Sequence, residues 1–181
     1  MPKGLIIINN GFEDVEGIAT IDVLRRAGMQ IELVSLDDTN IQTQSGLNLK
    51  SEKLLKDVKV DEYDFLVIPG GMAVFKYLHK RNEVSDIISK FAKKEKLIAT
   101  ICAAPSLVGK LGLFKDKKFT CFPGCEEGIV GKYTGKPVEV VGNFITAKSM
   151  AYTIDFALEI VKYLCGKEKA KSVENSIYAN K

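Results

Sequence analysis

The stretch Leu97-Ile98-Ala99-Thr100-Ile101-Cys102-Ala103-Ala104-Pro105-Ser106 decides the fold of this chain. An apolar and β-branched run leads into a cysteine, and small residues with a helical pattern follow. This order is typical of a buried parallel strand that ends in a sharp strand-to-helix turn. In an α/β protein such a turn presents a nucleophile at the carboxyl end of the sheet, beside the unpaired N–H groups of the next helix.

Cys102 has two interpretations at this place. The positive end of the following helix dipole favours a thiolate, which makes Cys102 a candidate nucleophile. A cysteine at the end of a strand is, however, also a common small residue of the apolar core. The stretch alone leaves both interpretations open.

The length and composition of the chain indicate a globular α/β protein. Its 181 residues suit one domain spanning residues 1–181, and a hydrophobic content of 46% with 27% charged residues is ordinary for a globule. The net charge of +3 is small and the lysines are spread along the chain, so nothing indicates a nucleic-acid partner. No window is apolar for long enough to span a membrane, and no signal peptide precedes the first strand, so we expect a cytoplasmic protein.

The four cysteines are expected to be free thiols in that compartment. Cys121 and Cys125 have a C-x3-C spacing, but a zinc site needs two more ligands, and the single histidine, His79, lies in an unrelated segment. We therefore expect neither a metal nor another cofactor. The charged neighbours of His79 favour a surface position for it over a catalytic one.

Apolar runs and helical patterns alternate along the rest of the chain. Strands are predicted at 4–9, 31–36, 64–68 and 97–101, helices at 15–27, 74–78, 84–91, 103–111 and 152–164, and hairpins at 41–49 and 138–146. A β-α-β order sets parallel strands with right-handed crossovers. We therefore expect a three-layer α/β/α sandwich with a mostly parallel sheet.

Three further residues are expected near Cys102. Gly70 and Gly71 directly follow a buried strand, where they form either a plain tight turn or a loop with exposed N–H groups. Because the carboxyl ends of parallel strands face one edge, this loop and Cys102 would share a crevice. Glu16 lies in the first turn of the first helix, over the same crevice. It is either a charge that favours the helix N-terminus or a partly buried acid beside a thiol, and its position alone does not separate the two.

Four segments in this order and spacing resemble the ThiJ/PfpI superfamily, in the branch of the parkinsonism-associated deglycase DJ-1 and its bacterial relatives. The resemblance covers nearly the whole chain, and the segments are Gly11-Phe12-Glu13-Asp14-Val15-Glu16, Val23-Leu24-Arg25-Arg26-Ala27-Gly28, Pro69-Gly70-Gly71 and Ala99-Thr100-Ile101-Cys102-Ala103-Ala104-Pro105.

The resemblance implies a flavodoxin-like sandwich, one ThiJ/PfpI-like (class I glutamine amidotransferase-like) domain, that forms a homodimer. It further implies that Cys102 is the reactive cysteine and that Glu16 is the protonated acid hydrogen-bonded to its thiolate. The amides of Gly70, Gly71 and Ala103 would polarise a bound oxygen.

The activity that the resemblance implies is glyoxalase- or deglycase-like, in oxidative and carbonyl stress. Its partners would be small reactive carbonyls such as methylglyoxal, or glycated adducts. An oxidation-sensing cysteine protein and a redox-regulated chaperone remain alternatives, because both sensing and catalysis use Cys102 and Glu16. A thiamin-pathway enzyme is disfavoured, since no phosphate loop of the G-x-x-x-x-G-K type is present.

The sequence departs from the family pattern at three places. Phe122 stands before Pro123 where family members often carry a histidine, so no Cys–His dyad is expected there and a protease is improbable. Bulkier residues at 148–151 replace a glycine-rich turn, and Gly46 stands where the human relative has an arginine. All three departures bear on the range of substrates.

Two expectations follow for the first helix. If Glu16 is protonated and shares its proton with the Cys102 thiolate, the apparent thiol pKa falls below ~8.5, whereas an ionised carboxylate would raise it. The apolar residues of this helix also cover more than one face, which predicts that the homodimer buries part of it.

Overall fold

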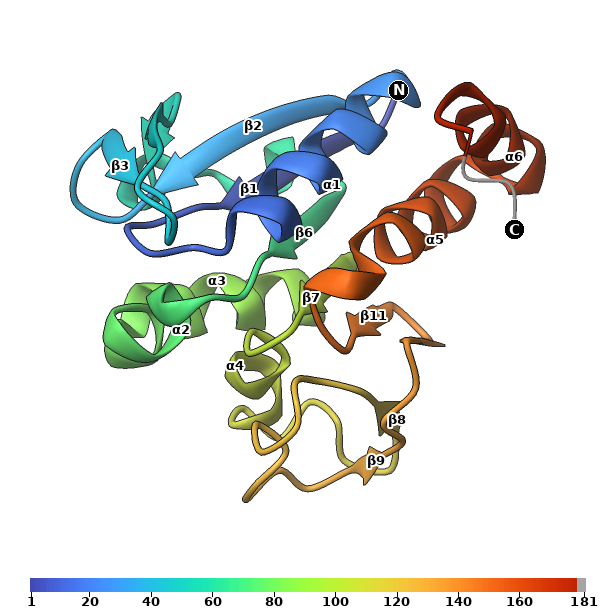
Figure 1. Ribbon diagram of the computed structural model, residues 1–181. Helices are drawn as coiled ribbons and strands as arrows, with labels where there is room; N and C mark the ends of the chain where they lie inside the picture. Colours follow the sequence, from blue (N-terminus) through green and yellow to red (C-terminus); the bar gives the residue numbers. More distant parts are fainter. Residues whose placement is uncertain (179–181) are drawn as a thin grey trace.

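The computed structural model describes residues 1–178 and has a seven-stranded sheet at its centre (Figure 1). The strand order is β10-β11-β7-β6-β1-β2-β5. All neighbouring strands are parallel except β10, which pairs antiparallel with β11. The strands of this sheet are β1 (Lys3–Ile7), β2 (Gln30–Ser35), β5 (Lys53–Leu54), β6 (Phe65–Ile68), β7 (Leu97–Ile101), β10 (Val138–Val141) and β11 (Phe144–Ala147).

Helices cover both faces of the sheet, which completes the three layers (Figure 1). The helices α1 (Asp14–Arg26), α5 (Thr153–Cys165) and α6 (Lys167–Ser176) pack together on one face. The other face is covered by α2 (Met72–Lys76), α3 (Asn82–Lys93) and α4 (Pro105–Gly109). The expected flavodoxin-like α/β sandwich with a mostly parallel sheet is therefore confirmed.

The central strands are buried on both faces because their sequences are apolar without alternation. Every residue of β6 and β7 is buried, and two separate apolar cores lie above and below the sheet. None of the helices in residues 1–178 is long and apolar enough to cross a membrane.

The two predicted hairpins are present. They are β3 (Asn40–Gln42) with β4 (Asn48–Lys50), and β10 with β11. Four features were not predicted from the sequence: the edge strand β5, the short pair β8 (Lys118–Phe119) with β9 (Lys132–Tyr133), helix α6 in the lysine-rich tail, and the early end of α4 at Gly109.

The carboxyl ends of β1, β6 and β7 meet at one edge, and hydrogen bonds join the loops that follow them. The Glu13 N–H donates to the Gly70 carbonyl over 3.1 Å, and Phe12 forms an isolated β-bridge with Gly71. The start of α1 is thereby fixed against the loop that follows β6. These loops surround Cys102, the first residue after β7.

Candidate active site

Cys102 occupies a strained backbone conformation at the end of β7. Its φ angle is 63°, in the left-handed region that residues with a Cβ rarely adopt. Its N–H donates to the Ala147 carbonyl over 2.9 Å, and its own carbonyl accepts the Phe122 N–H over 2.8 Å. Neighbouring strand and loop thus hold the turn from two sides, which is how a protein maintains such strain. The predicted sharp strand-to-helix turn is present.

We expect Cys102→Gly to be more stable than Cys102→Ala by about 1 kcal/mol, because glycine adopts this φ without the Cβ penalty. Denaturant unfolding of the two variants at one pH measures the difference. Ala103→Gly serves as the control, since Ala103 has no positive φ and glycine there should only destabilise the protein. Equal stability of the two Cys102 variants would show that the turn is unstrained.

Glu16 is a fully buried acid and not a surface charge at the helix end. The helix-capping role belongs to Glu13, whose carboxylate accepts the Glu16 N–H over 2.9 Å. The Glu16 side chain is 0% exposed, and its Oε2 accepts the Gly70 N–H over 2.8 Å. Its Oε1 is buried without a hydrogen-bond partner among residues 1–178. Of the two interpretations of Glu16, the structure therefore agrees with a buried acid beside a thiol and not with a charge that favours the helix N-terminus.

Gly70 allows Glu16 and Cys102 to come together. A Cβ at this position would lie 2.6 Å from the Cys102 Cβ and 2.7 Å from Glu16 Oε2. Gly71 has a φ of 90°, and a Cβ there would lie 2.5 Å from the Glu13 nitrogen. Both positions thus require glycine because neighbouring groups approach the backbone too closely for a Cβ, which a plain turn would not demand.

The expected set of oxygen-polarising amides needs one correction. The Gly70 N–H is used by Glu16, so it is not available to a bound oxygen. The Gly71 and Ala103 N–H groups lower the pKa of the Cys102 thiol. The Gly70 amide is therefore removed from the expected set, and the amides of Gly71 and Ala103 remain in it.

Burial raises the pKa of Glu16 to about 7, against the lowering effect of the Gly70 N–H and the Cys102 thiol. Burial also raises the pKa of the Cys102 thiol, and the Glu16 carboxylate raises it further. Of the two cases expected for the thiol pKa, the one with an ionised carboxylate therefore applies, because two adjacent buried charges repel. Because the two groups interact strongly, the pair titrates as a unit.

The raised pKa of Glu16 predicts that the protein loses stability as pH rises. Between the ordinary value of 4.5 and about 7, the folded state binds more protons than the unfolded state, so the free energy of unfolding falls with pH. The loss is about 3 kcal/mol at most. Denaturant unfolding at several pH values should show this decline in the wild type and its absence in Glu16→Gln. A decline of the same size in Glu16→Gln would assign it to another group.

Cys102 and Glu16 open into a pocket of about 460 Å³. Its wall is mostly apolar and includes Phe75, Phe122 and Met150, which are each about half exposed. Phe122 and the segment at 148–151, the places where the sequence departs from the family pattern, thus border the thiol. Sequence reasoning missed the other lining residues, which are Glu13, Gln44, Met72, Phe75 and Cys125. Of these five residues, only Cys125 had a signal in the sequence, which is the C-x3-C spacing that it forms with Cys121.

His79 is not the free surface residue that its neighbours suggested. It is half-buried, its Nε2 lies 2.9 Å from the Ser106 Oγ, and its ring lies against Phe75. Burial and the nearby Lys110 lower its pKa. His79 is not among the residues that line the thiol pocket.

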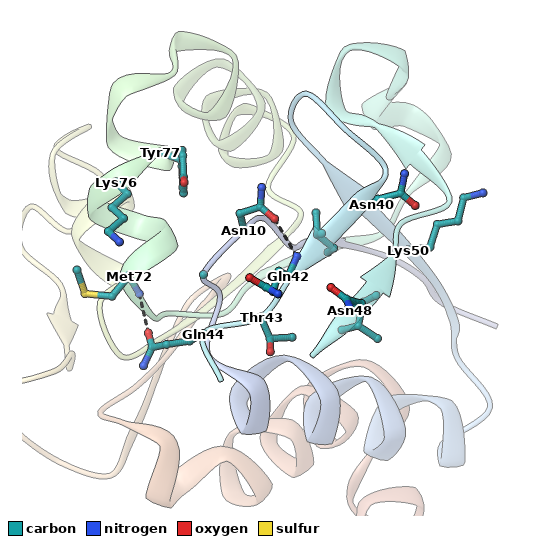
Figure 2. A pocket seen from close by; sticks show the side chains of 13 residues that line it. Asn10, Asn40, Gln42, Thr43, Gln44, Asn48, Lys50, Met72, Lys76 and Tyr77 are labelled. Atoms are coloured by element: carbon teal, nitrogen blue, oxygen red, sulfur yellow. Dashed lines mark hydrogen bonds between the residues drawn. The ribbon is translucent and has the colours of Figure 1, made fainter. Parts of the chain in front are cut away.

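A larger hollow of about 1100 Å³ lies between the β3–β4 hairpin and α2 (Figure 2). Amide side chains dominate its wall, and two of them make backbone contacts there: Asn10 Oδ1 accepts the Gln42 N–H and Gln44 Oε1 accepts the Met72 N–H. None of the predicted site residues lines this hollow. The chemistry-bearing groups are thus in the smaller pocket. Within residues 1–178 no cluster of three or more His, Cys, Asp or Glu side chains is placed to hold a metal ion.

Comparisons with known proteins assign this chain to a known family. The model of the DJ-1/PfpI family matches residues 2–163. The protein dj-1beta of Drosophila melanogaster is 31% identical over 179 residues, which cover 97% of this chain and 96% of that protein. Its crystal structure has a TM-score of 0.90 at 30% identity and covers 98% of this chain and 97% of the other.

Two further solved structures are similar over nearly the full length. A mutant of a DJ-1 superfamily protein from Salmonella typhimurium has a TM-score of 0.92 at 26% identity, covering 98% of both chains. Toxoplasma gondii DJ-1, described as oxidised, has a TM-score of 0.89 at 28% identity, again covering 98% of both chains.

Proposed function

Because the chain belongs to the DJ-1/PfpI family, we propose that it is a cysteine-dependent enzyme acting on small reactive carbonyls and their adducts. Its reaction is glyoxalase- or deglycase-like, with methylglyoxal as the test substrate. The observation that carries this proposal is the buried carboxyl of Glu16 beside the Cys102 thiol, both at the wall of one apolar pocket. A thiol and a proton-carrying acid are the two groups that such a reaction needs.

The first step is addition of the Cys102 sulfur to the aldehyde carbon of methylglyoxal. The new C–S bond gives a hemithioacetal, and the former carbonyl oxygen takes up the proton. The N–H groups of Gly71 and Ala103, which lower the thiol pKa, stabilise the negative charge that develops on this oxygen. Both donors belong to the fixed backbone, so they need no rearrangement during the reaction.

The second step moves a proton between the two neighbouring carbons. Glu16 removes the hydrogen from the carbon bonded to sulfur and returns a proton to the former ketone carbon, which gives a thioester of lactate. Water then cleaves the thioester, so that methylglyoxal and one water yield lactate and the free thiol. A carboxyl pKa of about 7 suits this work, because the acid accepts and donates protons at similar cost near neutral pH.

The size and surface of the pocket support a small substrate. A volume of about 460 Å³ holds a three-carbon dicarbonyl with room to spare, and the apolar wall suits its methyl group. The adjacent hollow between the β3–β4 hairpin and α2 shares Gln44 and Met72 with this pocket. Larger glycated adducts would extend in that direction.

The test combines thiol labelling with product formation. We expect sub-stoichiometric iodoacetamide at neutral pH to label Cys102 first, and time-resolved assays to show lactate formation by oxidant-free protein. Cys102→Ser should abolish lactate formation, while Cys165→Ser, a matched change at another half-buried cysteine, should keep it. Preferential labelling of another cysteine, or lactate formation by Cys102→Ser, would contradict the proposal.

Oxidation sensing is the second candidate function. The similar Toxoplasma protein was solved in an oxidised form, and an accessible thiol beside a protonated acid also favours oxidation to sulfenic and sulfinic acid. Stress-dependent sensing without turnover would give oxidised Cys102 and no lactate from the reduced protein. Retention of holdase activity by Cys102→Ala would instead indicate a chaperone role independent of the thiol.

We also propose that the chain forms a homodimer through the outer face of α1. Val15 and Ile18 are 44% and 39% exposed there, while Val23 and Leu24 of the same helix are buried in the core. Light scattering at micromolar concentration should report a dimer for the wild type and a monomer for Ile18→Lys. A monomeric wild type would contradict this assignment.

A further inference from the structure

The thiol pocket contains a second cysteine that the reaction above does not use. Cys125 is half-buried and lines the same pocket as Cys102. The other two cysteines do not line it: Cys121 is fully buried, and Cys165 ends helix α5. Two of the four cysteines therefore line one pocket.

The loop that carries Cys125 is attached directly to the turn at Cys102. The Phe122 N–H donates to the Cys102 carbonyl over 2.8 Å, and the Cys125 N–H donates to the Phe122 carbonyl over 2.9 Å. The second bond closes a turn from residue 122 to residue 125, whose ends lie within about 7 Å of each other. Cys125 thus folds back over the residue that is hydrogen-bonded to Cys102.

A disulfide needs Cα atoms roughly 4.4–6.8 Å apart, so movement of this turn toward Cys102 has to bring the two sulfurs into bonding range. Two features of the turn permit such a movement. Gly124, at its centre, has a φ of 92° and open space on its Cβ side, and Phe122 is 48% exposed. By contrast, Cys121 is packed in the core with its Sγ 3.9 Å from a Glu126 oxygen.

We propose that Cys125 is the resolving thiol for Cys102: after a hydroperoxide oxidises Cys102, Cys125 forms a reversible disulfide with it across the pocket. This inference rests on the proposed function in one respect, that Cys102 is the reactive thiol. It gives the C-x3-C motif a role, and it gives the protein a hydroperoxide-reducing activity in addition to carbonyl chemistry.

The two steps balance as follows. The Cys102 sulfur attacks one oxygen of the hydroperoxide, an S–O bond forms, the O–O bond breaks, and an alcohol or water leaves, so the sulfur is oxidised by two electrons to a sulfenic acid. The Cys125 sulfur then attacks the Cys102 sulfur. An S–S bond forms, the S–O bond breaks, and hydroxide leaves with the Cys125 proton as water. A small thiol or dithiol reduces the disulfide and restores both cysteines.

The consequence is protection of Cys102 from irreversible oxidation. A sulfenic acid without a resolving thiol reacts with a second hydroperoxide and becomes a sulfinic acid. Disulfide formation competes with that reaction and keeps the site recoverable. It also fills the pocket with the Cys102–Cys125 bridge, so carbonyl turnover stops until the bridge is reduced.

The experiment treats the full-length protein with stoichiometric hydrogen peroxide and maps its tryptic peptides without reduction. Cleavage at lysine places Cys102 in peptide 97–110 and the C-x3-C motif in peptide 119–132. We expect these two peptides to be linked in the wild type, and dithiothreitol to separate them and to restore lactate formation. Because Cys121 and Cys125 share a peptide, single serine variants identify the partner.

The variants decide the assignment. Cys125→Ser should lose the linked peptides and accumulate Cys102 sulfinic acid several-fold faster, whereas Cys121→Ser and Cys165→Ser should keep the link. Linked peptides that persist in Cys125→Ser, a disulfide within peptide 119–132, or equal sulfinic acid formation in wild type and Cys125→Ser would each overturn the inference. Those outcomes leave Cys102 reactive and the proposed function intact. A Cys102 that hydrogen peroxide and iodoacetamide both leave unmodified would overturn the two proposals together.

Discussion

Glu16→Gln is expected to leave Cys102 open to alkylation near neutral pH and to reduce lactate formation by about a hundredfold or more. The glutamine oxygen can still accept the Gly70 N–H, and its NH₂ group can donate to the Cys102 sulfur, so the thiol stays in place. The charge that raises the thiol pKa is removed, and with it the group that moves the proton between carbons. The variant therefore tests proton transfer separately from substrate binding and from addition of the Cys102 sulfur.

Two measurements made side by side test this expectation. Thiolate absorbance against pH should show a lower thiol pKa in Glu16→Gln than in the wild type, while the lactate assay shows little product. Glu13→Gln is the matched control, because Glu13 also lines the pocket but acts through its helix cap. Full turnover by Glu16→Gln would mean that the acid has no part in proton transfer.

Gly70→Ala should lower both the stability of the protein and the reactivity of Cys102. Its Cβ would lie 2.6 Å from the Cys102 Cβ and 2.7 Å from Glu16 Oε2, so the two reacting groups would be forced apart. Overpacking of this kind costs about 1–3 kcal/mol of stability. Because a small displacement of reacting groups costs about a hundredfold in rate, we expect alkylation and turnover to fall together.

Gly4→Ala separates this specific effect from general destabilisation. A Cβ at Gly4 would clash with the Phe65 ring at the amino-terminal end of β1, away from the pocket edge. Both variants should melt earlier than the wild type, but only Gly70→Ala should lose Cys102 alkylation at a temperature where both are folded. Loss of alkylation in Gly4→Ala to the same extent would show that the site responds to any weakening of the sheet.

The strands of the sheet could be predicted well because each strand is specified by its own residues and those that directly follow it. Continuous apolar runs specify buried parallel strands, and the turn residues that follow them specify where the strands end. Helix α6 escaped detection because only Ala170 and Val173 of its lysine-rich sequence are buried, which leaves too little apolar periodicity. The placement of Glu16 and Cys102 at one edge could also be predicted, since it follows from strand order.

What the sequence could not predict depends on where individual side chains point. The use of the Gly70 N–H by Glu16 follows from burial of that acid, and no local pattern distinguishes it from a surface glutamate at a helix start. The thiol pKa likewise depends on desolvation, which only the packed structure defines. Phe75 reaches the pocket from α2, where no sequence pattern indicated a site.

The hydrogen bond from the Cys102 N–H to the Ala147 carbonyl has a consequence for biosynthesis. The turn at Cys102 cannot take its final form until β11 has been translated, has left the ribosome and has paired with β7. Until then the nascent chain carries Cys102 at the end of a strand whose β11 edge is unpaired. The final conformation of the Cys102 turn therefore forms late in synthesis, when nearly all of the surrounding sheet is available to shield it.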